Sequence, residues 1–208
     1  FILLFLSAGF MYYLRAVKAG GNERITRKVS AHPNALFKAI SDVKIHKKAA
    51  IANAVAAGVC IGLVALGWKG FVYGPAIIFL TYAVQVALNM FRRKDSTILS
   101  TVNLTMLFTI LVMTIPFYAH PQMNLVWNST GLQPLLFIIA FTLAISFITT
   151  GFRDKPWLLV LGSLFVGGSV FFGLLWVLQY FDMSNSFNVL TTGSGYFTKN
   201  KIFGTIAE

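Results

Sequence analysis

The chain has 208 residues, of which 57% are hydrophobic, 15% are aromatic and only 11% are charged. This composition excludes an ordinary soluble domain and indicates a membrane protein. The net charge of +11 does not predict a nucleic-acid partner, because Lys and Arg lie between long apolar runs and not on one folded surface. The single cysteine, Cys60, excludes a disulfide framework or a CxxC metal site.

Several apolar runs approach the roughly 20 residues that a helix needs to cross a bilayer. In chain order they are Phe1 to Leu14, Ala49 to Trp68, Phe71 to Phe91, Ile98 to Ala119, Leu132 to Phe152 and Pro156 to Phe181. The first run stops before Arg15 and is too short to span, whereas each of the others is long enough. The sequence therefore predicts an all-α membrane protein, a polytopic transmembrane helix bundle with an external loop at its C-terminal end.

The start of the chain predicts that it is a piece of a longer protein. The first residue is Phe, and no charged segment precedes the apolar run FILLFL, so neither a native start nor a signal peptide is expected. We expect a partial transmembrane domain over residues 1–181 and the beginning of a large external loop over residues 182–208.

Lys and Arg alternate between the loops in the way that sets membrane orientation, since positive loops stay on the cytoplasmic side. The connection from Arg15 to Lys48 holds nine of them, whereas the loop from Tyr118 to Gly131 holds none. We therefore expect a multi-pass protein of the cell membrane, with loops 15–48, 92–97 and 152–155 in the cytoplasm and the C-terminal tail outside.

The long basic loop contains the stretch NALFKAISDVKIHKK after Pro33. Its apolar residues Leu36, Phe37, Ile40 and Val43 fall on one helical face. This pattern predicts a short amphipathic helix whose lysines face anionic membrane lipids, with a solvated basic loop as the alternative.

Small residues recur at every fourth position of the second run, at Ala50, Ala54, Gly58 and Gly62. This spacing lets helix backbones approach closely in a membrane. None of the five longer runs has Asp, Glu, Lys, Arg or His in its interior, which is unlike a proton-coupled transporter. We expect the most polar residues there, Gln85, Asn89 and Asn103, to satisfy each other or the backbone, so any chemistry should lie at a membrane surface.

Few groups outside the runs carry a chemical signal. His32, His46 and His120 lack metal-ligand spacing, and no phosphate-binding glycine loop or Ser/His/Asp arrangement occurs. Asp42, Asp95 and Asp154 lie among basic residues, where an ion pair or a helix cap is expected. The remaining candidate is the tail, which is rich in Gly and hydroxyl residues and is typical either of an external gating loop or of a plain connection.

The tail segment GSGYFTKNKIFGTIAE, residues 193–208, resembles the large external loop of archaeal-type oligosaccharyltransferase catalytic subunits, which belong to the C-type glycosyltransferase superfamily. Thr205, Ile206, Ala207 and Glu208 match that family's Thr-Ile-x-Glu motif at each position. The stretch ALGWKGFVY, residues 65–73, is similar to the family's outer helix-turn-helix.

The resemblance implies an enzyme that transfers a glycan from a dolichol-type lipid (pyro)phosphate carrier to Asn of Asn-x-Ser/Thr sequons, which is protein N-glycosylation. It implies that Glu208 is a catalytic carboxylate that holds the acceptor amide and lies in or next to the shell of a divalent metal, Mn or Mg. Its partners would be the lipid-linked oligosaccharide, an acceptor polypeptide and membrane lipids. Lys69, Lys199 and Lys201 are candidate contacts for the lipid phosphate.

The chain departs from the family in lacking its first-loop DxD motif and its C-terminal WWDxG sequence. Most metal ligands would therefore lie outside these residues, and we expect the 208 residues to be inactive alone. The sequence leaves two alternatives open: another membrane glycosyltransferase that uses a lipid-phosphate sugar, or a non-enzymatic polytopic transporter or scaffold.

Overall fold

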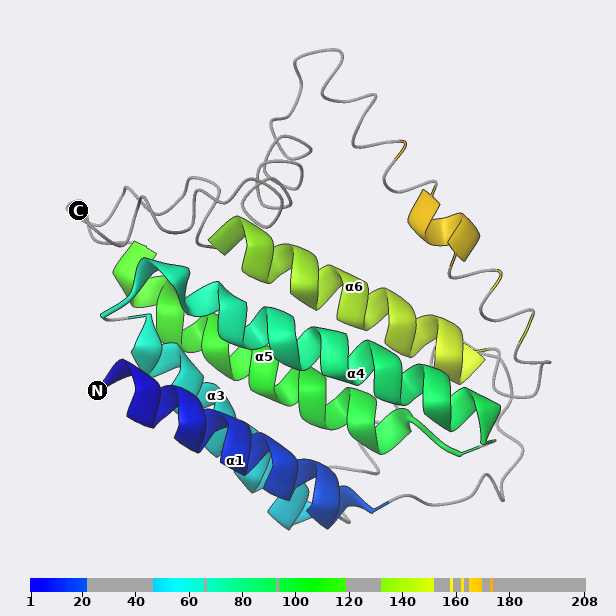
Figure 1. Cartoon of the computed structure of the whole chain (residues 1–208), viewed down its shortest axis with the longest axis horizontal. Coiled ribbons are helices and arrows are strands. Elements are labelled where there is room, and N and C mark those ends of the chain that lie inside the picture. Colours follow the sequence, from blue (N-terminus) through cyan, green and yellow to red (C-terminus); the bar gives the residue numbers. More distant parts are fainter. Residues whose placement is uncertain are drawn as a thin grey trace. The chain divides into compact units, whose positions relative to one another are not determined.

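The computed structural model of the chain is all-helical in the part it describes. It describes residues 1–21, 47–65, 67–92, 94–118 and 132–151, together with residues 158, 162, 165–169 and 173. The chain divides into two compact units, Phe1–Leu161 and Gly162–Glu208. All of the helices discussed below belong to the first unit (Figure 1).

The helices follow the predicted apolar runs closely, with small shifts at their ends. They are α1 (Ile2–Gly20), α3 (Lys48–Val64), the short 3-10 helix η1 (Lys69–Val72), α4 (Tyr73–Phe91), α5 (Thr97–Tyr118) and α6 (Leu132–Gly151). The last predicted run, 156–181, and the predicted amphipathic helix after Pro33 lie outside the described residues or are described only at scattered positions.

Three of these helices are long and apolar enough to cross a membrane: α1, α4 and the Thr97–Pro116 part of α5. Helix α4 has 19 residues, so it is about 28 Å long and matches the hydrocarbon thickness of a bilayer. The apolar helix α3 is shorter, at 17 residues, as is the apolar part of α6, Pro134–Thr150. The predicted all-α membrane helix bundle is confirmed, and the described helices are those of a multi-pass membrane protein.

The prediction that the first run is too short to span was wrong. Helix α1 continues past Leu14 to Gly20 and has 19 residues. The sequence prediction ended the run at Arg15, but this side chain is exposed and its guanidinium carbon lies 5.8 Å from the centre of the Tyr12 ring. A long cationic side chain near the end of a helix can reach the membrane interface without ending the helix.

Contacts between the helices fix their relative directions. Gly67, just after α3, lies near Ile2 at the start of α1, and Gly20 at the end of α1 lies against Ile98 at the start of α5. Side-chain hydrogen bonds pair the end of α4 with the start of α5, from Asn89 to Ser96. Helices α1, α4 and α6 therefore run in one direction, and α3 and α5 run in the other (Figure 1).

Helix α3 packs between α1 and α5, and its small residues make this possible. Ala50 and Ala54 are fully buried. A Cβ atom added to Gly58 would lie 2.6 Å from Thr109 Cβ and 2.7 Å from the Met106 carbonyl oxygen, and one added to Gly62 would lie 2.8 Å from Met113 Cβ. The predicted close approach of backbones along this face is therefore confirmed.

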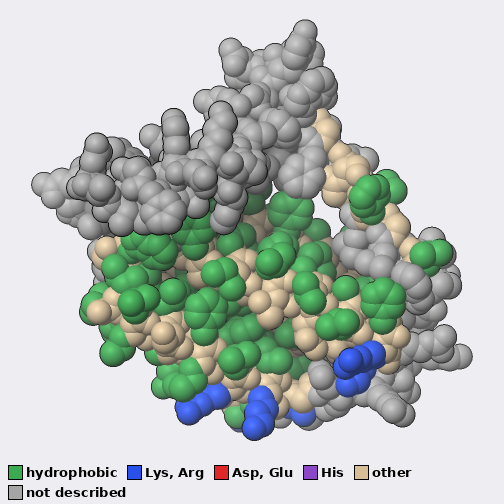
Figure 2. Space-filling model, viewed as in Figure 1, with side chains coloured by type: hydrophobic (Ala, Val, Ile, Leu, Met, Phe, Trp, Pro, Cys, Tyr) green, Lys and Arg blue, Asp and Glu red, His purple; other side chains and the backbone are tan. Residues whose placement is uncertain are grey.

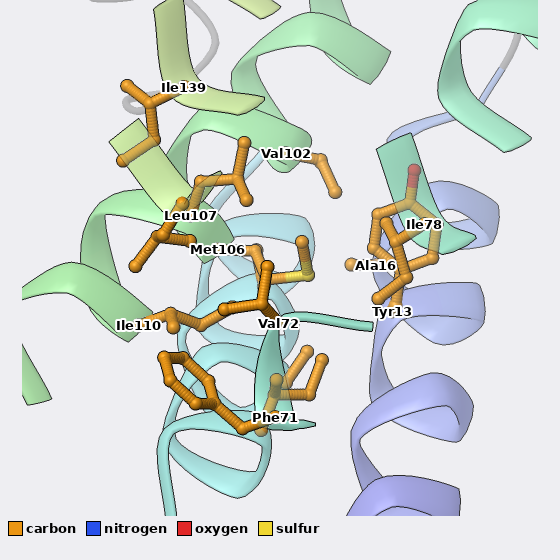
Figure 3. Packing of buried hydrophobic residues seen from close by; sticks show 14 of the residues in the cluster. Tyr13, Ala16, Phe71, Val72, Ile78, Val102, Met106, Leu107, Ile110 and Ile139 are labelled. Atoms are coloured by element: carbon orange, nitrogen blue, oxygen red, sulfur yellow. The ribbon is translucent and has the colours of Figure 1, made fainter. Parts of the chain in front are cut away.

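The main hydrophobic core joins side chains from every described helix of the first unit. Phe71 and Val72 of η1 and Ile78 of α4 are buried in the same cluster as Met106 and Ile110 of α5 (Figure 3). The opposite side of α4 is apolar and exposed, as expected for a surface that faces lipid. Its exposed residues recur at helical spacing: Tyr73, Ile77, Leu80, Val84, Leu88 and Phe91.

We predict that Gly58→Ala destabilises the bundle by about 1–3 kcal/mol, the usual range for overpacking a filled site. The new methyl group would press on the Met106 carbonyl, and this backbone atom can move only if α5 moves. Gly167→Ala is the matched control, because its Cβ meets nothing within 4 Å and the gain in helix propensity is the same. Thermal unfolding in detergent measures both, and equal midpoints would contradict the close contact.

Candidate functional site

The described part of the bundle contains a line of buried polar side chains where α4, α5 and α6 meet, which we call the polar seam. On α6, Thr142, Ser146 and Thr150 recur at every fourth residue and are all buried. This spacing places them on one helical face. The facing members are Tyr82 and Asn89 of α4, and Ser96, Ser100 and Asn103 on and just before α5.

Tyr82 is the centre of the seam, because its hydroxyl joins three helices. The Tyr82 Oη atom lies 2.9 Å from Ser100 Oγ on α5 and 3.0 Å from Ser146 Oγ on α6. The Ser146 hydroxyl donates to the Thr142 carbonyl at 2.6 Å, and a hydroxyl has only one hydrogen to donate. Ser146 Oγ therefore accepts from Tyr82, and Tyr82 Oη accepts from Ser100.

A second set of hydrogen bonds in the seam lies one turn further along α5. The Asn103 amide donates to Thr142 Oγ1 at 3.4 Å, and the Thr142 hydroxyl donates to the Ile138 carbonyl. Asn103 is fully buried, and its Oδ1 atom accepts no hydrogen bond from the described residues. The sequence prediction that this asparagine is satisfied therefore holds only for its NH2 group.

A third set of hydrogen bonds lies where α4 ends and α5 begins. The Gln85 amide donates to Asn89 Oδ1 at 3.5 Å, and the Asn89 amide donates to Ser96 Oγ at 3.4 Å. The predicted partnership of Gln85 with Asn89 is confirmed. Asp95 Oδ1 accepts from the Thr97 backbone N–H at 3.0 Å and from the Thr97 hydroxyl at 2.7 Å, so this carboxylate caps α5 as predicted.

The seam can bind helices together, but its own groups supply no general acid or base. Its members are hydroxyls and amides, which donate and accept hydrogen bonds without exchanging protons near neutral pH. Among the described residues, no three His, Cys, Asp or Glu side chains gather as a metal site would require, and Cys60 forms no disulfide. The observed role of the seam is therefore to join α4, α5 and α6.

The two ends of the bundle differ in charge. All Lys and Arg residues whose side chains are described lie at the end where α1, α4 and α6 finish, which we call the basic rim. They are Arg15, Lys18, Lys47, Lys48, Arg92 and Lys94. In Figure 2 the Lys and Arg side chains follow the lower edge, next to an apolar surface.

The opposite end carries the turn between α3 and α4, residues 65–72. The described part of this segment is a turn followed by η1, which leads into α4. Trp68 and Tyr73 are 38% and 51% exposed, and their ring centres lie 6.0 Å apart. Exposed Trp and Tyr are typical of the membrane–water interface, so this turn marks the end of the apolar layer away from the basic rim.

The predicted catalytic residues fall outside the part of the chain that the structure describes. This holds for Thr205, Ile206, Ala207 and Glu208, for Lys199 and Lys201, and for the histidines and Asp42 and Asp154. Only the backbone of Lys69 is described, as the first residue of η1. The polar seam was not predicted from the sequence. The recurrence of Thr142, Ser146 and Thr150 at every fourth residue was a signal for a polar face on this helix.

Comparisons with known proteins add no family. No protein-family profile, no curated protein and no solved structure matches the chain.

We predict that Tyr82→Phe destabilises the bundle by about 1 kcal/mol, since inter-helix hydrogen bonds in membranes contribute roughly 0.6–1.7 kcal/mol. The change keeps the ring and removes the one hydroxyl that joins Ser100 and Ser146. Tyr73→Phe is the control, because that ring is half exposed. Reversible unfolding in bicelles measures the difference, and a Tyr82→Phe, Ser146→Ala double-mutant cycle without coupling would contradict the shared bond.

Proposed function

We propose that this chain is part of the catalytic subunit of an archaeal-type oligosaccharyltransferase, an enzyme that moves a glycan from a lipid (pyro)phosphate carrier to Asn of an Asn-x-Ser/Thr sequon. The proposal rests on the Thr205–Glu208 motif together with the arrangement of the bundle. The arrangement matters because the proposed reaction requires Glu208 to lie on the external side of the membrane.

The single observation that supports this sidedness is the position of the basic rim. Helix α6 runs toward the rim, as the pairing of Asn103 with Thr142 and of Tyr82 with both Ser100 and Ser146 requires. A further crossing by the apolar run 156–181 would bring residues 182–208 to the opposite end. If the rim is cytoplasmic, as positive loops usually are, Glu208 is external, where exported polypeptides and flipped lipid carriers meet.

In the proposed reaction, Glu208 holds the acceptor amide NH2 and weakens the conjugation that makes this nitrogen a poor nucleophile. The nitrogen forms the new bond to the sugar C1 atom and passes a proton to water at the membrane surface. The bond from C1 to the phosphate oxygen breaks, and the lipid phosphate leaves with its electron pair. A divalent metal, when bound, stabilises the charge of the leaving phosphate. Lys199 and Lys201, and Lys69 at the start of η1, would attract that phosphate as point charges.

The described interior also favours a second candidate, a non-enzymatic scaffold. Several of its buried polar groups are joined to one another across helices. The ionisable side chains placed in the described apolar interior are those of Tyr12, Tyr13, Tyr82 and Cys60. An interior of this kind is poor in the charged groups that ion-coupled transport requires. The two candidates differ at Glu208, which a scaffold does not need.

We predict that Glu208→Gln lowers glycan transfer to an Asn-x-Thr peptide by roughly 100-fold or more, the usual loss when one group that stabilises the transition state is removed. The assay uses the intact protein as the cell makes it, with Glu23→Gln as a control on the predicted opposite side. Unchanged turnover in Glu208→Gln would exclude the catalytic role, and the scaffold would then be the better proposal.

The sidedness has its own test, which does not depend on activity. In a Cys60→Ser background, we expect a membrane-impermeant maleimide to label Ser194→Cys in intact cells and to label Arg92→Cys only after the membrane is opened. Arg92 is exposed, so its accessibility depends on the side of the membrane and not on burial. The reverse pattern would contradict the external position of the tail.

A further inference from the structure

We propose that the basic rim binds the headgroups of anionic phospholipids, with the acyl chains lying on the apolar faces directly beside it. This inference uses the described helices only and is independent of the proposed enzyme function.

The first part of the rim is formed where α1 ends beside the start of α3. Gly9 packs against Ile61 and Ala57, and Gly67 packs against Ile2. In this antiparallel pair, the residue numbers of two facing positions therefore have a sum of about 66–70. The same alignment places Lys18 within about one turn of Lys48 along the helix axes. Both side chains are exposed, so two cations on neighbouring helices lie at the same depth.

Arg15 extends this cluster one turn deeper. Lys18 follows it by three residues, so the two side chains share a face of α1. The Arg15 guanidinium lies over the Tyr12 ring, 5.8 Å from the ring centre, and the aromatic contact restricts a side chain that would otherwise be free to reorient. An exposed, partly oriented guanidinium suits a phosphate group, which it can bind through two parallel N–H donors.

The second part of the rim is the turn between α4 and α5. The turn is held in place because the Lys94 backbone N–H donates to the Asn89 carbonyl at 2.8 Å. Arg92 is exposed beside it. Asp95 is the only acidic residue in the described part of the chain, and its Oδ1 atom already accepts two hydrogen bonds from Thr97. The rim therefore has a strong excess of positive charge.

The apolar surface beside the basic rim indicates which class of anion binds there. Met11 and Leu14 on α1, and Leu88 and Phe91 on α4, are large apolar residues that are exposed next to the cations. A soluble phosphate or a nucleic acid would leave this apolar surface in water, whereas a phospholipid covers it with its acyl chains and meets the cations with its headgroup. Each cation near an anionic membrane surface contributes a factor of roughly five in affinity.

The test measures lipid selectivity of the whole chain reconstituted in phosphatidylcholine bilayers. Spin-labelled phosphatidylglycerol and phosphatidylcholine with identical acyl chains report the association constant of each lipid at the protein surface. We expect the wild-type chain to prefer phosphatidylglycerol, and we expect this preference to fall roughly fivefold or more in Arg15→Gln/Lys18→Gln and in Arg92→Gln/Lys94→Gln. High salt should weaken it, because these charges are exposed.

Two control variants separate charge from structure. Trp68→Phe changes an exposed side chain at the opposite end of the bundle, keeps every charge and should leave the selectivity unchanged. The exchange Arg15→Lys/Lys18→Arg keeps both charges and should retain the preference, so its loss would point to disturbed packing and would contradict the proposal.

The proposal is overturned if the wild-type chain binds both lipids equally, or if Trp68→Phe reduces selectivity as much as the rim variants do. Displacement of the lipid by soluble glycerol 3-phosphate would also overturn it, because the site would then recognise the phosphate group alone. Because glycan transfer is not part of this measurement, failure of the enzyme proposal leaves its outcome unaffected.

Discussion

The structure depends on one constraint: a polar group inside a membrane has no water to bond, so another group of the protein must satisfy it. Tyr82 meets this constraint across three helices, accepting from Ser100 and donating to Ser146. The bond helps to fix α6, whose buried face also carries Thr142 and Thr150, against α4 and α5. In α3 the same constraint acts differently: Gly58 lets its backbone approach α5 so closely that packing replaces hydrogen bonding.

The same constraint determines where chemistry can occur. Because the hydroxyls and amides of the seam bond to one another, they hold helices together and are not available as acids or bases for a substrate. In the described part, the charged side chains lie at or near an end of the bundle, where water is available. The described interior therefore joins the helices and sets the distance between the two ends of the bundle.

The sequence predicted the helices better than it predicted their contacts. Apolar length located α4 and α5 within a few residues, because hydrocarbon thickness limits a span directly. The end of α1 was wrong because Arg15 was treated as the end of the run, although its long side chain can reach the interface. The bond from Tyr82 to Ser146, two residues 64 positions apart in the chain, was not predictable. It depends on how α4 aligns with α6, and the spacing of residues within one helix does not give that alignment. The proposed catalytic residues, 205–208, lie outside the described part of the chain, so their role remains a prediction from the sequence.

The polar seam is not spread evenly along the bundle. The hydrogen bonds that join α4, α5 and α6 lie between the basic rim and Asn103, within about 9 Å of the start of α5. Beyond this level, the described contacts between helices include the approach of Gly58 to the Met106 carbonyl and the apolar contacts of Phe71 and Ile110. The hydrogen bonds between helices are therefore concentrated next to the basic rim. Toward Trp68 and Tyr73, the described helices are held together by close packing, as at Gly62 and Gly74.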